Sequence, residues 1–284
     1  MKHRIVAFTA FFLLFACLMP IQAKKKCTLR VASFNLRMNT KVDKENAWPL
    51  RKETAKDLIR FYDFDIFGTQ EGFADMLDDI LELGNYARIG QGRDGEDEGE
   101  HSAIIYKKDK FELLEHGDFW YSETPDRVGH GWDAKCCNRI CSWGKFKEKA
   151  TGRKFYFFNS HFDHQGVVAR RESSRLMLER IKAVVTDDVP VFATGDYNAS
   201  PKEEPIQILQ NDGLLLNAYD ISEQKPYGTV GTFHGFGKYP EGSSRIDHIF
   251  VTKGVRIIKY ATINDKPNGK FPSDHFPIMV LAEF

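Results

Sequence analysis

The sequence lacks an excess of charge of either sign, because 40 lysines and arginines balance 40 aspartates and glutamates. Removing residues 1–23 takes away Lys2 and Arg4 and no acid, which changes the formal charge from 0 to −2. A nearly neutral chain has no basic field of the kind that drives tight, sequence-independent binding of nucleic acid. The composition therefore argues against a DNA-coating role. It leaves open a hydrolase that holds its substrate through a metal ion and a few arginines.

Cysteine is scarce, with 5 in 284 residues. Four of them follow residue 23, namely Cys27, Cys136, Cys137 and Cys141. A zinc site at the last three lacks a second pair of ligands at the usual spacing. Buried thiols or one disulfide are therefore the better interpretations. We expect the neighbours Cys136 and Cys137 not to pair with each other, and sequence alone does not determine the pairing.

A long apolar run occurs only at the N-terminus, over residues 5–19, after Lys2 and Arg4 and before Ala23. The run is too short to span a bilayer comfortably, so we predict a signal peptide over residues 1–23. The protein would then be exported, to the periplasm or the cell exterior, with no membrane span after removal of the peptide. The alternatives are a buried helix and a lipid anchor attached at Cys17.

The remainder, residues 27–284, is predicted to be one domain. Its composition supports a sizeable core, because 42% of the chain is hydrophobic and 13% is aromatic. Apolar runs predict strands at 29–34, 65–70, 103–106, 155–159, 189–194, 246–251 and 277–282. Helical spacing of apolar residues predicts helices at 49–61, 75–83 and 169–185. Mixed strands and helices along one chain predict a layered α/β or α+β sandwich.

Polar residues gather where these apolar runs begin or end. The segments are 33–37, 68–71, 159–164, 195–199, 245–250 and 273–277. A core needs none of these acids, amides and histidines, whereas loops at strand ends commonly display catalytic groups on a rigid scaffold. One Asp-His pair alone is more often a detail of a loop. Six such segments together indicate a functional site.

These segments resemble the motifs of the endonuclease/exonuclease/phosphatase superfamily, which includes deoxyribonuclease I, abasic-site endonucleases, sphingomyelinases and inositol-phosphate 5-phosphatases. The motifs are, in order, SFNLR, GTQE, EHSAIIY, NSHFDH, GDYNA, RIDHIF and PSDHFPI. The resemblance covers roughly residues 27–284. It implies a four-layer α/β sandwich, with two mixed central β-sheets flanked by helices. The run from His161 to His164 is typical of a bacterial branch of secreted, metal-dependent hydrolases.

The resemblance also implies roles for individual residues. The metal ligands would be Asn35, Glu71 and Asp274, whose oxygens suit a hard cation such as Mg²⁺ or Mn²⁺. In catalysis, Asp196 would orient or deprotonate the attacking water, Asp247 would pair with His275, and Glu100 would support His161. The substrate phosphate would be bound by Asn198, Arg139 and Arg37.

The function implied by the resemblance is that of a secreted, metal-dependent phosphoesterase in which water attacks a phosphodiester in line. One alternative on the same fold is a lipid-, inositol- or sugar-phosphate hydrolase, similar to a sphingomyelinase, rather than a nuclease. A catalytically inactive binding module is the other. The expected partner is a phosphate-ester substrate, which could be nucleic acid, a lipid headgroup or a small phosphodiester. No protein partner is implied. Nucleophile motifs of other hydrolases, Gly-x-Ser-x-Gly and the P-loop, are absent.

Overall fold

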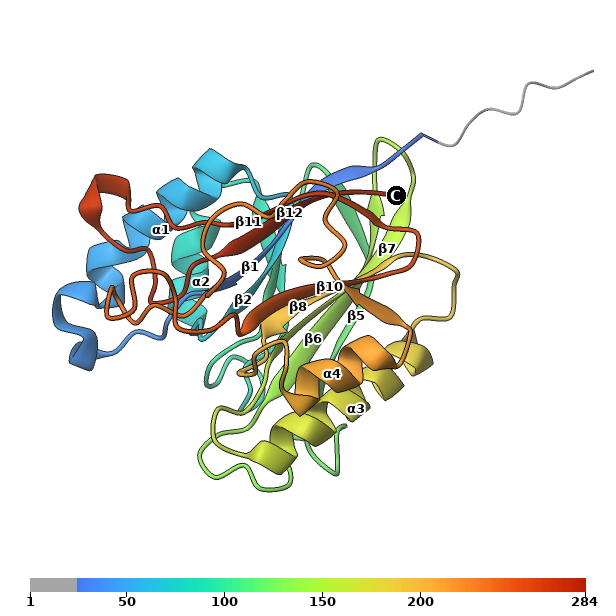
Figure 1. The fold of residues 1–284 in the computed structure, drawn as a ribbon, viewed down its shortest axis with the longest axis horizontal. Coiled ribbons are helices and arrows are strands. Elements are labelled where there is room, and N and C mark those ends of the chain that lie inside the picture. The colour runs from blue at the N-terminus through green and yellow to red at the C-terminus, as the bar shows by residue number, and fades with distance from the viewer. Residues whose placement is uncertain (1–24) are drawn as a thin grey trace, which may run out of the picture.

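The computed structural model describes residues 25–284, so the expected signal peptide lies outside the described residues (Figure 1). The described chain contains two six-stranded sheets, with strand orders β11-β12-β1-β2-β4-β3 and β5-β6-β7-β8-β10-β9. The strands of the first sheet are β1 (Thr28–Asn35), β2 (Ile66–Gln70), β3 (Tyr86–Ile89), β4 (Ile104–Lys107), β11 (Arg256–Thr262) and β12 (Ile278–Glu283). Those of the second are β5 (Phe111–Trp120), β6 (Ile140–Glu148), β7 (Lys154–His161), β8 (Val191–Asp196), β9 (Leu215–Asn217) and β10 (Asp247–Thr252).

Helices cover the outer face of each sheet (Figure 1). Helices α1 (Trp48–Tyr62) and α2 (Ala74–Leu81) pack on the first sheet, and α3 (Val167–Val184) and α4 (Glu204–Asn211) pack on the second. Two short 3-10 turns complete the described elements, η1 (Lys41–Asn46) and η2 (Pro267–Gly269). Within residues 25–284, no helix is long and apolar enough to cross a membrane. The predicted four-layer sandwich is confirmed.

The alternation of side chains along the central strands determines where the polar residues lie. In β1, Leu29 and Val31 pack between the two sheets, whereas Phe34 packs under the helices of the first sheet. Because side chains alternate along a strand, Asn35 shares the inner face with Leu29 and Val31. The same alternation in β7 places His161 on the inner face of the second sheet. The space between the sheets is therefore apolar at one end and polar at the other.

A buried polar layer joins the two sheets near the polar end. The amide nitrogen of Asn159 donates to the carbonyls of Thr69 at 2.8 Å and Ala103 at 3.0 Å. The amide oxygen of Asn159 accepts from Gln70 Nε2 at 2.7 Å. Because Asn159 lies on β7 and Gln70 on β2, these bonds connect the inner faces of both sheets. The amide of Asn159 is thus fully paired, and buried polar groups paired in this way help to specify one arrangement of the layers.

Gly68 of β2 lies against this polar layer with no room for a side chain. A Cβ atom at this position would overlap the side chains of Asn159 and Thr194. We therefore expect Gly68→Ala to lower the free energy of unfolding by about 2 kcal/mol, as overpacked cores do. Urea unfolding followed by circular dichroism measures the change. Gly129→Ala is the matched control, because a Cβ there meets nothing within 4 Å. Equal stability of the two variants would contradict the close approach of the sheets.

Candidate active site

The strand ends meet at one edge of the sandwich. Strand β1 runs parallel to β2, and β7 runs parallel to β8, so their carboxyl ends lie together. Strand β10 is antiparallel to β8 and begins at this edge, which places Asp247 opposite Asp196. A pocket of about 650 Å³ opens here, and nine of the expected site residues line it: Arg37, Glu71, Glu100, Arg139, His161, Asp196, Asn198, Asp274 and His275. The other two, Asn35 and Asp247, are hydrogen-bonded to residues of the pocket.

Two carboxylates and an imidazole gather in this pocket. Glu71, Asp196 and His275 each offer a ligand atom, and these atoms lie within 4.8 Å of one another. The amide nitrogen of Asn35 donates to Glu71 Oε1 at 3.1 Å and to Asp196 Oδ2 at 3.0 Å. The amide oxygen of Asn35 instead accepts from the backbone N–H of Arg37 at 2.9 Å. In this arrangement Asn35 holds the two carboxylates together, and its oxygen faces away from them.

A third carboxylate, that of Asp274, lies beside this group. Burial raises the pKa of Asp274, and Glu71 adds to the effect against the opposing charge of His275. Burial also raises the pKa of Asp196, with a further contribution from Asp247. The ionised forms of neighbouring buried acids repel one another, and a cation bound between them offsets this repulsion. Carboxylate oxygens are suitable ligands for a hard divalent ion. The donor set therefore fits a divalent metal.

Arg37 approaches the same carboxylates from the pocket wall. Its guanidinium lies 3.8 Å from Glu71 Oε2 and 3.8 Å from Asp274 Oδ2. It also forms a closer pair with Asp43, at 2.8 Å. Part of the positive charge of Arg37 is therefore already balanced by Asp43, which weakens the attraction of Arg37 for a phosphate.

His275 forms a buried pair with Asp247. The Nδ1 atom of His275 lies 2.9 Å from Asp247 Oδ2, and its Nε2 atom lies 3.8 Å from Asp196 Oδ2. Burial alone would lower the pKa of His275, but the charge and hydrogen bond of Asp247 raise it well above its ordinary value. The imidazole is therefore held as the cation, with Nε2–H directed toward the pocket.

We expect Asp247→Asn to lower the pKa of His275. The substitution keeps the shape of the side chain but removes the negative charge that offsets the cost of burying an imidazolium. A histidine that stays charged above its usual pH range in the wild type would then lose its proton at lower pH in the variant. Titration of the imidazole resonances by NMR measures this shift. An unchanged pKa in the variant would show that Asp247 does not set the charge of His275.

His161 occupies the facing side of the pocket. Its Nε2 atom lies 3.6 Å from Asp196 Oδ2, and its Nδ1 atom lies 4.0 Å from Glu100 Oε2. Burial and then the charges of Arg139 and Arg93 lower the pKa of His161 well below its ordinary value. His161 is thus a neutral imidazole, in contrast to the charged His275.

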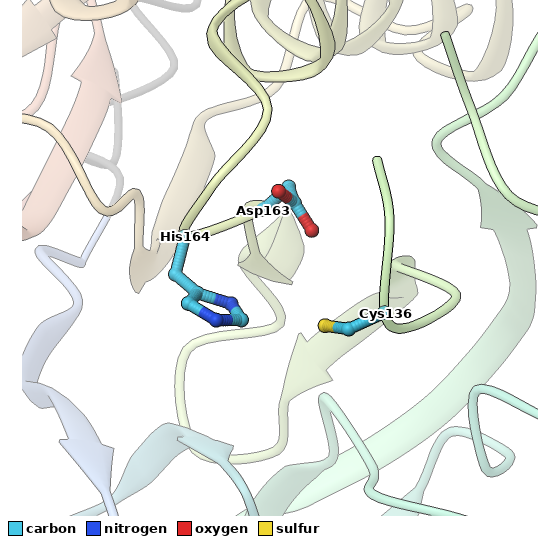
Figure 2. Close-up of side chains that lie close together, drawn as sticks. All are labelled: Cys136, Asp163 and His164. Atoms are coloured by element: carbon cyan, nitrogen blue, oxygen red, sulfur yellow. The ribbon is translucent and has the colours of Figure 1, made fainter. Parts of the chain in front are cut away.

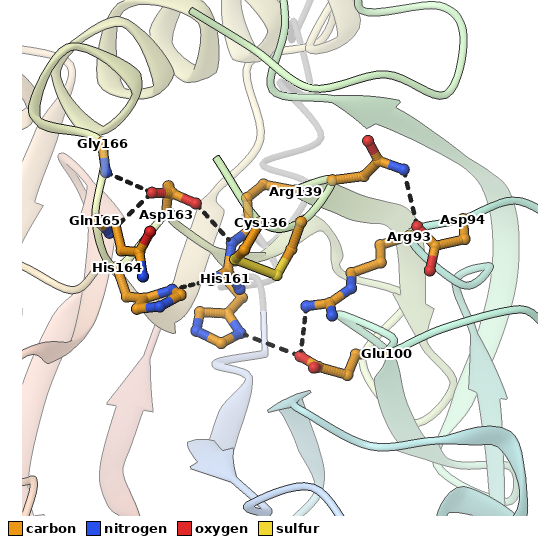
Figure 3. Close-up of a disulfide and its surroundings, with 12 residues drawn as sticks. Arg93, Asp94, Glu100, Cys136, Arg139, His161, Asp163, His164, Gln165 and Gly166 are labelled. Carbon is orange, nitrogen blue, oxygen red and sulfur yellow. Dashed lines mark hydrogen bonds and ion pairs between the residues drawn. A yellow bond between two sulfur atoms is a disulfide. The ribbon is translucent and has the colours of Figure 1, made fainter. Parts of the chain in front are cut away.

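Two arginines supply positive charge next to His161, the buried Arg139 and the half-buried Arg93 (Figure 3). Arg93 pairs with Glu100 at 2.8 Å, which makes Arg93, rather than His161, the closer partner of this acid. Arg139 donates from Nη2 to His164 Nδ1 at 2.9 Å. Both arginines line the pocket, where a guanidinium can bind a phosphate with two parallel hydrogen bonds. Arg93 was not among the expected site residues, because it lies in a glycine-rich segment, residues 90–99, that resembles none of the motifs.

Asn198 is held in the left-handed region of backbone conformation, at φ 47°. Its backbone N–H donates to Asp196 Oδ1 at 2.9 Å, and its amide nitrogen donates to the carbonyl of Phe162 at 3.0 Å. Asparagine tolerates this conformation better than most residues. Asn198 therefore fixes the orientation of Asp196, and its amide retains one N–H for a ligand.

Arg51 of α1 supports the loops of the site and was also missed. Its side chain is buried and donates to four backbone carbonyls, those of Leu36, Arg37, Asn46 and Pro272. These carbonyls belong to loops that lie next to the carboxylates of the proposed metal site, Glu71 and Asp274. The sequence signal was the spacing of Arg51, three residues after the buried Trp48 on the same helix face.

The expectation that Cys136 and Cys137 do not pair is wrong, because they form a disulfide. They lie in an irregular loop between β5 and β6, where no strand or helix prevents the backbone from closing the small ring. The other cysteines of the described chain, Cys27 and Cys141, are buried and free.

A second group of possible metal ligands lies beside the disulfide. Cys136, Asp163 and His164 offer atoms within 4.8 Å of one another (Figure 2). The sulfur of Cys136 is bonded to that of Cys137, however, and is not a thiolate. Arg139 lies 3.5 Å from Asp163 and hydrogen-bonds to His164, so a cation already fills this position. The group does not fit a metal centre.

Residues 32–275 match the model of the Endonuclease/Exonuclease/phosphatase family. An uncharacterized protein of Acanthamoeba polyphaga mimivirus is 29% identical over 196 residues, which cover 64% of this chain and 70% of that protein. Two solved structures from Bacteroides thetaiotaomicron are similar over nearly the whole chain. One is a mannosyl-6-phosphatase, 41% identical with a TM-score of 0.86, covering 90% of this chain and 100% of that one. The other, an endonuclease/exonuclease/phosphatase family protein, is 40% identical with a TM-score of 0.87, covering 92% and 97%.

The family match spans most of the chain, and the two Bacteroides structures share its whole described fold. Members of this family are phosphoester hydrolases, and they generally depend on a divalent metal. The expected resemblance is therefore confirmed: the chain belongs to the endonuclease/exonuclease/phosphatase family.

Proposed function

We propose that this protein is a phosphatase that releases phosphate from a sugar phosphate, with a hexose 6-phosphate as the substrate class. The observation that carries the proposal is its 41% identity to a mannosyl-6-phosphatase, all of which the match covers. This favours the sugar-phosphate alternative over the phosphodiester substrate first expected.

The shape and charge of the site support a small substrate. The pocket has a volume of about 650 Å³, which suits a single sugar phosphate. Its positive charge is confined to Arg37, Arg93, Arg139 and the charged His275. The chain as a whole has no excess of basic residues to track a long polyanion. These features favour a compact phosphate ester over nucleic acid.

The metal would be Mg²⁺ or Mn²⁺, held by Glu71 and Asp274 with Asp196 nearby. When bound, such an ion neutralises charge on the phosphoryl oxygens and lowers the barrier to attack by water. Asn35 would keep Glu71 and Asp196 at their present separation through its two hydrogen bonds.

The remaining residues would act on the water and the phosphoryl group. Asp196, held by Asn35 and Asn198, would accept a proton from the attacking water or orient it. The charged His275 would donate from Nε2 to a phosphoryl oxygen, and the neutral His161 would offer a second imidazole from the facing wall. Arg139 and the free N–H of Asn198 would stabilise the charge that develops as the ester bond breaks.

A substrate panel with the purified protein and Mg²⁺ tests the proposal. The panel contains mannose 6-phosphate, glycerol 3-phosphate, a nucleoside monophosphate, bis-p-nitrophenyl phosphate and plasmid DNA. We expect kcat/KM for mannose 6-phosphate to exceed that for the other substrates at least about tenfold, a difference of about 1.4 kcal/mol in transition-state binding. Faster cleavage of the diester or of DNA would overturn the substrate class but not the chemistry.

We also propose that residues 1–23 direct export and are then removed. The charged start, the short apolar run and the small residue at position 23 support this proposal. The disulfide supports it as well, because disulfides persist in oxidising compartments. N-terminal sequencing of the protein from the periplasm should begin at Lys24. Recovery of the intact Met1 form from the cytoplasm alone would contradict export.

A further inference from the structure

The Cys136–Cys137 disulfide lies at the active-site pocket rather than in the core. Cys137 is one of the residues that line the pocket, and Cys136 is exposed. Figure 3 shows the disulfide close to His161, between His164 on one side and Arg93 on the other. No step of the proposed mechanism uses this sulfur pair, so its position calls for another explanation.

The loop that carries the disulfide is anchored directly after Cys137, at Asn138 and Arg139. Asn138 donates from its amide to Asp94 at 2.8 Å. The carbonyl of Arg139 accepts from the backbone N–H of Tyr121 at 2.8 Å, and the guanidinium of Arg139 bonds to His164. The sulfur pair therefore has a fixed position relative to the phosphate-binding side chains. A rigid contact surface costs little conformational entropy when a ligand binds to it.

The burial of the pocket residues separates its floor from its rim. Asp196 is 1% exposed, His275 is 4% exposed and His161 is 7% exposed, so the reacting phosphoryl group must enter deeply. Cys137 is only half-buried. A phosphate held among the buried side chains would leave its ester substituent at the rim, where Cys137 is one of the lining residues.

The chemistry of the disulfide differs from that of its neighbours. Charged and polar side chains surround it, and among them the arginines and histidines can donate a hydrogen bond to the phosphate. The two joined sulfurs have no N–H or O–H donor, and they present a polarizable, apolar surface. Such a surface complements the C–H face of a sugar ring and does not compete with the arginines for the phosphate.

We propose that the Cys136–Cys137 disulfide is the part of the site that contacts the sugar ring of the substrate and contributes to selection of a hexose phosphate. This inference rests on the proposed sugar-phosphatase function and names a specificity determinant for it. The disulfide binds the leaving group, while Arg139 and His275 bind the phosphate.

The test compares three forms of the protein: untreated, reduced with a phosphine, and the Cys136→Ala/Cys137→Ala double variant. For each form, KM and kcat for mannose 6-phosphate are measured, together with the Ki of inorganic phosphate as a competitive inhibitor. Reduction and the double variant should each raise KM for mannose 6-phosphate about tenfold, equivalent to about 1.4 kcal/mol. In the same two forms, the Ki of inorganic phosphate should change less than about twofold. The phosphine should have no effect on the double variant, which serves as the matched control.

Each other outcome has a defined meaning. An unchanged KM would show that the disulfide does not touch the sugar and would overturn the inference. Parallel increases in KM and in the Ki of phosphate would overturn it too, because the disulfide would then only position Arg139. Alkylation of Cys136 and Cys137 in unreduced, denatured protein, detected by mass spectrometry, would remove its basis. If the untreated protein hydrolyses no hexose phosphate in the substrate panel, the proposed function itself fails first.

Discussion

Glu71→Gln is expected to abolish tight binding of Mg²⁺ or Mn²⁺ and with it nearly all phosphatase activity. Glu71 accepts from Asn35 through Oε1 and from the backbone N–H of Met38 through Oε2. An amide at this position loses the negative charge and places an NH₂ group against one of these donors. We expect metal affinity to fall at least about a hundredfold, or about 2.7 kcal/mol. Activity should fall on the order of a thousandfold at ordinary metal concentrations.

Isothermal titration calorimetry, with metal titrated into folded Glu71→Gln, measures the loss of metal affinity directly. Glu148→Gln is the matched control, because Glu148 is a buried glutamate that accepts from Thr151 and does not line the pocket. The control should bind metal as the wild type does. Wild-type metal affinity in Glu71→Gln, with its circular dichroism spectrum unchanged, would remove Glu71 from the metal site.

Asp196→Asn should lower phosphatase activity by a similar factor, because it removes the proposed general base rather than a metal ligand. Oδ2 of Asp196 lies 3.6 Å from Nε2 of His161 and 3.8 Å from Nε2 of His275, so both imidazoles adjoin this carboxylate in the pocket. An asparagine keeps the volume but cannot accept a proton from water. General base catalysis contributes about 10² to 10⁴ in rate, so we expect kcat to fall on the order of a thousandfold. KM should change much less, because the lost interaction belongs to the transition state.

The control for this variant is Asp118→Asn. Burial also raises the pKa of Asp118, which bonds to Ser142 and is not among the residues lining the pocket. Loss of a buried carboxylate there should leave kcat within about twofold of the wild type, as for a substitution remote from the reacting atoms. A large fall in KM together with kcat in Asp196→Asn would indicate relief of ground-state strain instead of loss of a base.

Most of the strands that could be predicted from sequence are buried on both faces. The apolar runs at 155–159 and 189–194 correspond to β7 and β8, which lie in the middle of the second sheet. Strand β5 was missed, because it is an edge strand with exposed Glu112, Glu115 and His116, and its pattern therefore lacks a continuous apolar run. Helix α4 was missed because it is only eight residues long and begins after a run of polar residues.

The site could be predicted as far as its residues lie at the ends of buried strands. Asp196 and His161 are of this kind, and strand direction alone brings them together. Arg93 could not be assigned in the same way, because its role depends on a loop folding back onto Glu100. The disulfide was missed for a related reason: pairing of adjacent cysteines depends on local backbone conformation, which no residue pattern specifies.

We infer that this pocket hydrolyses phosphate esters through a divalent metal held by its carboxylates. The most direct measurement is phosphate release from mannose 6-phosphate by the purified protein, first in EDTA and then after addition of excess Mg²⁺ or Mn²⁺. We predict that EDTA abolishes release and that either metal restores it, because the buried acids would otherwise repel an anionic substrate. Full activity in EDTA, or no activity on any phosphate ester with metal present, would contradict the claim.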